Sequence, residues 1–201
     1  MGRFDLIAWD FDGVLNRNVI DGALIWARDF ETDLGAPLED FQNYVFRSGR
    51  FRDVLIGKRD LRTVVANWIA TAKLDHSPED ILDYWFAKDA HTDVEVLALL
   101  KSIQCRHVIA TNNEAHRARF ILQDMGFSSV VEHMFAAGPM GTAKPSPEFF
   151  MQIEEWSGLP ADRLVLIDDA DANIKAAAKR GWQTFLFSDE TRAGLAAWLG
   201  R

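Results

Sequence analysis

A strand signal and a turn meet near the start of the chain, where Leu6-Ile7-Ala8-Trp9 is followed directly by Asp10-Phe11-Asp12-Gly13. A short run that is apolar throughout, without alternation, is typical of a parallel β-strand covered on both faces. Further runs share this character: Val108-Ile109-Ala110, Leu164-Val165-Leu166-Ile167, Thr184-Phe185-Leu186-Phe187 and, more weakly, Met134-Phe135-Ala136-Ala137. These runs predict the strands of a parallel sheet.

Helical patterns separate these runs in the second half of the chain, at 94–103, 114–125, 147–156, 171–180 and 190–199. Strands that alternate with helices predict an α/β fold with a doubly wound, Rossmann-like parallel sheet. Residues 16–91 differ, because they contain no convincing strand but several amphipathic helix candidates, at 23–34, 38–46, 60–72 and 78–86. This segment is too long for an ordinary crossover. We therefore predict a Rossmann-like core of residues 1–15 and 92–201, with an inserted helical cap of residues 16–91.

Composition narrows the possible functions. The 201 residues are 48% hydrophobic and 26% charged, as in an ordinary globular chain. The formal charge of -8 repels phosphate backbones, so we expect no nucleic-acid partner. Cys105 is the only cysteine, so no intramolecular disulfide can form. No run approaches the length of a membrane span, and Asp5 and Asp10 interrupt any secretory signal, so we expect a cytoplasmic protein without a membrane partner.

Polar side chains follow the predicted strands, at the sheet edge where open parallel sheets bind ligands. Four separate segments supply them: Asp10 with Asp12, Thr111 with Asn112 and Asn113, Lys144, and Asp168 with Asp169. Converging carboxylates repel one another unless a divalent cation lies among them, and oxygen-only ligands favour Mg²⁺. A metal, an ammonium and a hydroxyl group together suit a phosphoryl group, and an aspartate can serve as its nucleophilic acceptor.

The same residues carry a family resemblance. Asp10-Phe11-Asp12-Gly13-Val14-Leu15 resembles the first signature of the haloacid dehalogenase-like hydrolase superfamily. Thr111, Lys144 and Asp168-Asp169 fall where its second, third and fourth signatures would be, so the match spans essentially the whole chain. The inserted segment is similar to the helical cap of the superfamily's first subfamily. The resemblance implies the strand order 3-2-1-4-5, with the strand before Asp10 in the centre.

The resemblance also implies a role for each residue. Asp10 would be the nucleophile that accepts the phosphoryl group. Asp12 would be the general acid that protonates the leaving oxygen, and then the base that activates water to hydrolyse the aspartyl-phosphate. Thr111 would bond the phosphoryl group, and Lys144 would hold both that group and Asp10. The Mg²⁺ site would consist of Asp10, Asp168 and Asp169, with the backbone carbonyl of Asp12.

Asp12 distinguishes the branches of the superfamily, because its dehalogenases lack an acid at this position and a halide leaves without a proton. We therefore expect a Mg²⁺-dependent phosphatase acting on a small phosphorylated metabolite, and family resemblance alone suggests a sugar phosphate. A phosphomutase would share every catalytic residue and remains an alternative, whereas Asp12 disfavours a 2-haloacid dehalogenase. Motif order disfavours a signalling receiver, and the intact set of residues disfavours a binding module that has lost catalysis.

Substrate-binding residues are harder to assign. A basic cluster lies in the predicted cap of an otherwise acidic chain, formed by Arg47, Arg50, Arg52, Lys58 and Arg59. Arg50 and Arg59, together with Asn112, are our candidates for binding a small phosphorylated substrate, and a solvated surface is the alternative for the arginines. Asn112 and Asn113 could instead cap the next helix, a role we also assign to Asp171 and Asn173. The sequence carries no signal for an oligomeric state.

Overall fold

The computed structural model describes residues 4–20 and 22–201, so residues 1–3 of the predicted core and Asp21 of the predicted cap lie outside the described residues. Five parallel strands form one sheet in the order β5-β4-β1-β6-β7. The strands are β1 (Leu6–Trp9), β4 (Arg106–Thr111), β5 (His133–Ala136), β6 (Leu164–Asp168) and β7 (Gln183–Leu186). Numbered among themselves in chain order, these strands lie in the order 3-2-1-4-5 with β1 in the centre. The predicted strand order is therefore confirmed.

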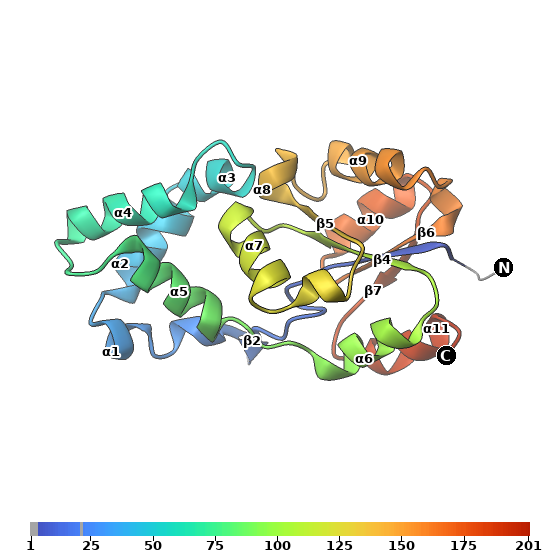
Figure 1. Cartoon of the computed structure of the whole chain (residues 1–201), viewed down its shortest axis with the longest axis horizontal. Helices are drawn as coiled ribbons and strands as arrows, with labels where there is room; N and C mark the ends of the chain where they lie inside the picture. The colour runs from blue at the N-terminus through green and yellow to red at the C-terminus, as the bar shows by residue number, and fades with distance from the viewer. Residues whose placement is uncertain (1–3, 21) are drawn as a thin grey trace.

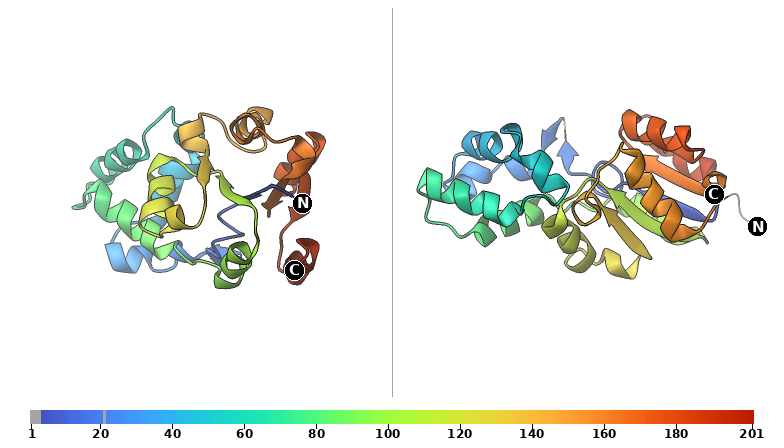
Figure 2. Two further views of the ribbon diagram at one scale, coloured as in Figure 1. Left: turned by 45° about the vertical axis from the view of Figure 1, so that its right-hand side comes forward. Right: turned by 90° about the horizontal axis from the view of Figure 1, so that it is seen from above.

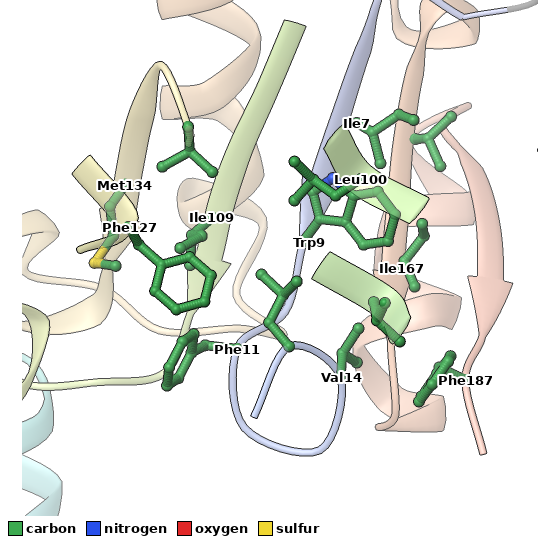
Figure 3. Packing of buried hydrophobic residues seen from close by; sticks show 14 of the residues in the cluster. Ile7, Trp9, Phe11, Val14, Leu100, Ile109, Phe127, Met134, Ile167 and Phe187 are labelled. Atoms are coloured by element: carbon green, nitrogen blue, oxygen red, sulfur yellow. The ribbon is translucent and has the colours of Figure 1, made fainter. Parts of the chain in front are cut away.

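Helices cover both faces of this sheet (Figure 1). One face packs against α6 (Val94–Ser102), α7 (Ala115–Gln123) and α11 (Leu195–Trp198), and the other against α9 (Pro147–Ser157) and α10 (Asp171–Lys179). Because side chains alternate along a strand, Ile7 and Trp9 enter the first layer while Leu6 and Ala8 enter the second. Figure 3 shows Trp9 in the first layer, near Leu100 of α6. Burial on both faces explains why β1 is apolar throughout.

A second lobe lies beyond the carboxyl edge of the sheet (Figures 1 and 2), and we call residues 25–88 the helical lobe. Its helices are α1 (Phe30–Leu34), α2 (Leu38–Gln42), a π-helical turn (Asn43–Arg47), α3 (Arg50–Leu55), α4 (Leu61–Ala72) and α5 (Pro78–Lys88). The lobe has its own aromatic core, which includes Trp26, Phe30, Phe41, Trp68 and Trp85. Helices thus make up most of the inserted segment, whose role as a cap stays a prediction.

The first part of this insertion differs from the predicted helix at 23–34. Val19–Ile20 (β2) and Ala23–Leu24 (β3) pair as an antiparallel hairpin, and a 3-10 helix (Ile25–Ala27) then leads to α1. Gly22 has a φ of 75°, a left-handed value that glycine adopts readily. The Asp21-Gly22 pair is itself a hairpin signal in the sequence. The prediction of no strand within 16–91 was therefore wrong.

Short helices complete the described structure: Phe127–Ser129, α8 (Ala137–Met140), Ala161–Arg163 and Arg192–Gly194. The two lobes touch closely where α3 ends, because a Cβ atom placed on Gly57 would lie 2.5 Å from the carbonyl oxygen of Gly138 in α8. Gly57 also has a φ of 70°, so glycine is required there on both counts. No helix in the described ranges is both long and apolar enough to span a bilayer.

Candidate active site

The loop after β1 folds tightly against β6. The backbone N–H of Asp10 donates to the carbonyl of Ile167 at 2.8 Å, and the N–H of Gly13 donates to the carbonyl of Asn16 at 2.8 Å. Gly13 has a φ of 84°, and a Cβ atom on it would lie 2.2 Å from Oδ2 of Asp169. Only glycine therefore lets this loop and the Asp169 carboxylate approach so closely.

A buried lysine joins two of the aspartates. The Nζ of Lys144 lies 3.0 Å from Oδ1 of Asp10 and 2.5 Å from Oδ2 of Asp168, and its side chain is fully buried. The backbone N–H of Phe11 also donates to Oδ1 of Asp10 at 2.7 Å. These contacts fix the Asp10 carboxylate at the end of β1, with one cation beside it.

Asn173 adds a contact that the sequence interpretation missed. Its Nδ2 donates to both oxygens of Asp168, at 2.9 and 3.1 Å, and the backbone N–H of Ala170 donates to Oδ1 at 2.9 Å. The assignment of Asn173 to helix capping was therefore wrong, because its side chain points back to the end of β6. Asp171 lies in the first turn of α10 and pairs with Lys175 at 2.5 Å, as a structural residue would.

Three aspartates form an acid cluster, since Asp10, Asp168 and Asp169 offer carboxylate oxygens that all lie within 4.8 Å of one another. Burial raises the pKa of Asp10 to about 8 against the attraction of Lys144, and the neighbouring Asp168 raises it further. Burial also raises the pKa of Asp169, again with repulsion from Asp168. The cluster thus holds more negative charge than Lys144 offsets. An oxygen-only set with excess negative charge fits a hard divalent cation.

Asp12 is not among the carboxylates of the acid cluster. Its Oδ1 accepts a hydrogen bond from Nδ2 of Asn16 and its Oδ2 accepts one from Nδ2 of Asn113, both at 2.9 Å. Nδ2 of Asn113 also donates to Oγ1 of Thr111 at 2.7 Å, so the predicted acid and the predicted phosphoryl-binding hydroxyl share one amide. Oδ1 of Asp12 lies a further 3.6 Å from Nη2 of Arg117.

Asn112 lies beside Lys144 rather than at a helix cap. Its side chain exchanges two hydrogen bonds of 2.9 Å with the backbone N–H and carbonyl of Lys144. Glu114 caps α7 instead, accepting from the backbone N–H groups of His116 and Arg117. The capping alternative for Asn112 and Asn113 is thus excluded, and both asparagines hold parts of the site in place.

A pocket of about 190 Å³ opens beside Asp12, between the two lobes, and we call it the interlobe pocket. The segments that follow β1 and β4, together with α7, contribute Asp12, Asn112, Asn113, Glu114 and Arg117, and the remaining lining residues are Asn18, Leu24, Trp26, Phe46, Phe51, Trp85 and Asp89. Asn16, Asn18, Asp89 and Arg117 were not among the predicted site residues. They carry no motif, and distant segments bring them together.

The two candidate arginines lie elsewhere, since the described residues that line the interlobe pocket include neither Arg50 nor Arg59. Arg50 donates to the carbonyl of Tyr44 at 3.3 Å and stacks over its ring at 4.3 Å. Arg59 is half-exposed and lies 3.9 Å from the carboxylate of Asp53. The structure therefore brings together the predicted catalytic and metal-binding residues with Asn112, and leaves the two arginines on the surface of the helical lobe.

Comparisons with known proteins bear on the fold and the family. Residues 4–181 match the family model of haloacid dehalogenase-like hydrolases. A comparison with curated proteins finds no match. One similar structure is a HAD-like family hydrolase from Porphyromonas gingivalis, with a TM-score of 0.80 and 16% identity over 100% of both chains.

Two further structures are also similar. A HAD family enzyme from Bacteroides thetaiotaomicron, solved with magnesium and inorganic phosphate, has a TM-score of 0.77 and 19% identity, covering 96% of this chain and 98% of that one. A 2-haloacid dehalogenase from Pseudomonas syringae pv. Tomato has a TM-score of 0.67 and 18% identity, covering 90% and 85%. At these identities the likeness shows a shared fold. Because the family model runs from β1 through β6 and all four polar segments, the chain belongs to the haloacid dehalogenase-like hydrolases.

Proposed function

We propose that this hydrolase is a Mg²⁺-dependent phosphatase that cleaves small phosphate monoesters through an aspartyl-phosphate on Asp10. The observation that carries the proposal is the place of Asp12, two residues after Asp10. Asn16 and Asn113 hold its carboxylate outside the acid cluster, where it lines the interlobe pocket. An alcohol leaving group needs a proton and a halide does not, so an acid at this place supports ester cleavage over dehalogenation.

The proposed reaction has two steps. In the first, a carboxylate oxygen of Asp10 bonds to phosphorus, the bond to the ester oxygen breaks, and Asp12 gives its proton to that oxygen. In the second, Asp12 takes a proton from water as the water attacks phosphorus, which releases phosphate and restores Asp10. Thr111 accepts from Asn113, so its own hydroxyl hydrogen is free to bond a phosphoryl oxygen. Lys144 neutralises charge beside Asp10 in both steps.

The acid cluster supplies the Mg²⁺ ligands in this proposal. Asp10 and Asp169, with the backbone carbonyl of Asp12, would hold the ion. Asp168 would add its charge, because Lys144, Asn173 and a backbone N–H already occupy its oxygens. The bound ion would neutralise phosphoryl oxygens. The neighbour from Bacteroides thetaiotaomicron, solved with magnesium and inorganic phosphate, supports this choice of ion.

The test is phosphate release from a panel of sugar phosphates, nucleotides and short acid phosphates, with Mg²⁺ or with a chelator. Wild type is compared with Asp10→Asn, whose fold is checked by circular dichroism. We expect release that requires Mg²⁺ and disappears in the variant, and retained activity in Asp10→Asn would exclude the covalent route. A bisphosphate intermediate with little free phosphate would indicate a phosphomutase, and halide release from a 2-haloacid would indicate a dehalogenase.

A further inference from the structure

The interlobe pocket also restricts which esters fit. We propose that Asp89, through its ion pair with Arg117, makes this pocket select leaving groups that are compact and uncharged over those that carry a carboxylate or a second phosphate. The inference rests on the proposed function, because it places the leaving group of the ester in this pocket. The group that Asp12 protonates must lie against Asp12, and Asp12 lines the pocket.

Size is the first restriction. The pocket volume of about 190 Å³ lies below the roughly 300–1,000 Å³ of pockets that hold drug-sized ligands. A leaving group of a few carbon and oxygen atoms suits a pocket of this size.

The outer wall of the pocket is aromatic and uncharged. Trp26, Phe46, Phe51 and Trp85 line it, and the ring of Phe46 lies 4.8 Å from that of Phe51 and 5.3 Å from that of Trp85. Such rings pack against the C–H groups of a leaving group. They carry no positive charge that could compensate an anion for lost water.

The charged residues of the pocket disfavour an anion as well. Three carboxylates line it, from Asp12, Asp89 and Glu114, and Arg117 is the one cationic side chain among the described residues there. The guanidinium of Arg117 is already engaged. Its Nη2 lies 2.6 Å from Oδ2 of Asp89, its Nη1 donates to the carbonyl of Phe86 at 3.2 Å, and its side chain is only 4% exposed. Asp89 therefore uses the positive charge that an anionic leaving group would need.

Asp89 also carries an acceptor without a donor. The residue is 4% exposed, and its Oδ2 receives Arg117 and Nδ2 of Asn18, at 2.6 and 3.2 Å. For its buried Oδ1 the described residues provide no hydrogen-bond partner. An ionised carboxylate on the leaving group would add negative charge beside this unsatisfied oxygen and has no donor to give. The pocket thus favours a neutral leaving group.

A matched pair of esters tests this selectivity. Glycerol 3-phosphate and 3-phosphoglycerate share the phosphate ester and a three-carbon skeleton, and differ at the far carbon, which bears a hydroxyl group or a carboxylate. Binding is measured by calorimetry with Mg²⁺ in the Asp10→Asn protein, so that no hydrolysis is needed. The pH is 8, because burial raises the pKa of Asp89 to about 7 and the residue must be ionised. We expect glycerol 3-phosphate to bind at least about tenfold more tightly, equal to about 1.4 kcal/mol.

Adding Asp89→Asn to that protein isolates the role of Asp89. The side chain keeps its shape but loses its charge, so Arg117 becomes available to a carboxylate. We expect the ratio of the two affinities to fall at least about tenfold. Asp75→Asn, which removes an exposed carboxylate of the helical lobe, is the control and should leave the ratio unchanged. Should Asp89→Asn not fold, Phe51→Arg, which adds a cation to the half-buried pocket wall, should improve 3-phosphoglycerate binding by a similar factor.

Several outcomes would overturn the inference: equal or tighter binding of 3-phosphoglycerate in the Asp10→Asn protein, a ratio that Asp89→Asn leaves unchanged, or no binding of either ester. In the case of Phe51→Arg, unimproved binding of 3-phosphoglycerate counts against it equally. None of these outcomes depends on hydrolysis. The proposed function fails separately, if wild type releases phosphate from no ester in the panel.

Discussion

Replacing Gly13 by alanine should impair the metal site while the rest of the fold stays intact. The added Cβ atom would lie 2.2 Å from Oδ2 and 2.7 Å from Cγ of Asp169. Non-bonded carbon atoms prefer 3.5–4.0 Å, so the Asp169 carboxylate must move by roughly 1 Å. Since Asp169 is a proposed Mg²⁺ ligand, Gly13→Ala should weaken ion binding even though it removes no acidic side chain.

The effects of the substitution on stability, Mg²⁺ affinity and turnover can be estimated separately. A φ of 84° is a left-handed conformation, which costs an L-residue about 1–2 kcal/mol of folding free energy. In a domain of this size, 1 kcal/mol shifts Tm by roughly 2–4 °C. The displaced carboxylate should lower Mg²⁺ affinity at least about tenfold, as disturbed ligand orientation does at metal sites. Misplacement by 1 Å should reduce turnover about 100-fold.

Gly126→Ala provides the matched control. Gly126 has a φ of 78°, and a Cβ atom placed on it has no neighbour within 4 Å. Thermal unfolding should show the backbone cost in both variants, because both glycines have a left-handed φ, and any further loss in Gly13→Ala comes from the contact with Asp169. Calorimetric Mg²⁺ titration and phosphate release should be impaired in Gly13→Ala alone. If Gly13→Ala binds Mg²⁺ as tightly as Gly126→Ala does, the close approach of Gly13 and Asp169 has no part in the metal site.

Four further predictions concern the same site. Asp12→Asn should lower kcat about 10²–10⁴-fold in phosphate-release assays without a comparable loss of Mg²⁺ affinity, and a mild effect would refute its acid and base role. Asn173→Ala removes the side-chain donor to Asp168 and should cost about 10–100-fold in Mg²⁺ affinity or activity, whereas wild-type behaviour would make Asn173 dispensable. Because the pKa of Asp10 is raised to about 8, Mg²⁺ must displace a proton from it below that pH. Apparent Mg²⁺ affinity should therefore rise with pH up to about 8 and level off above it. Calorimetry at pH 7 in two buffers that differ in ionisation enthalpy counts the protons released when Mg²⁺ binds. The release of no proton would contradict the prediction. The same raised pKa means that the ion-free protein should lose stability as the pH rises from about 4 to 8, which urea unfolding can follow.

The sheet could be predicted because its strands have a single environment. β1 and β6 are covered on both faces, so every residue in their apolar runs is buried, and few other environments select a run of that kind. The polar segments could be predicted for a related reason, since parallel strands deliver whatever follows them to one edge. The β2–β3 hairpin was not predicted, because two-residue strands carry almost no periodicity. The Asp21-Gly22 pair in the sequence was the one signal available for it.

Side-chain partners were less accessible to sequence reasoning. The basic cluster containing Arg50 was noticed because of its charge, but a cluster of charged residues in the sequence does not show where their side chains point. In the structure, Tyr44 binds the Arg50 guanidinium on the surface of the helical lobe. Asn173 looked like a capping residue because it follows an acidic pair at a helix start. Its actual partner, Asp168, is five residues away and is reached only once β6 and α10 are packed. Such roles depend on tertiary geometry, which local patterns do not encode.

Arg117 is the clearest example of a residue whose role depends on tertiary geometry. Within a run without any motif, it places one guanidinium 2.6 Å from Asp89 and 3.6 Å from Asp12, and also donates to the carbonyl of Phe86 at the end of α5. The proposed acid and the proposed selector of the leaving group therefore share one cation. A change of charge at Asp89 must alter the field at Asp12, so selectivity and proton transfer are coupled at this end of the pocket. The aromatic wall carries no charge, so a change of ring size there alters the space for the leaving group without adding or removing a charge near the acid.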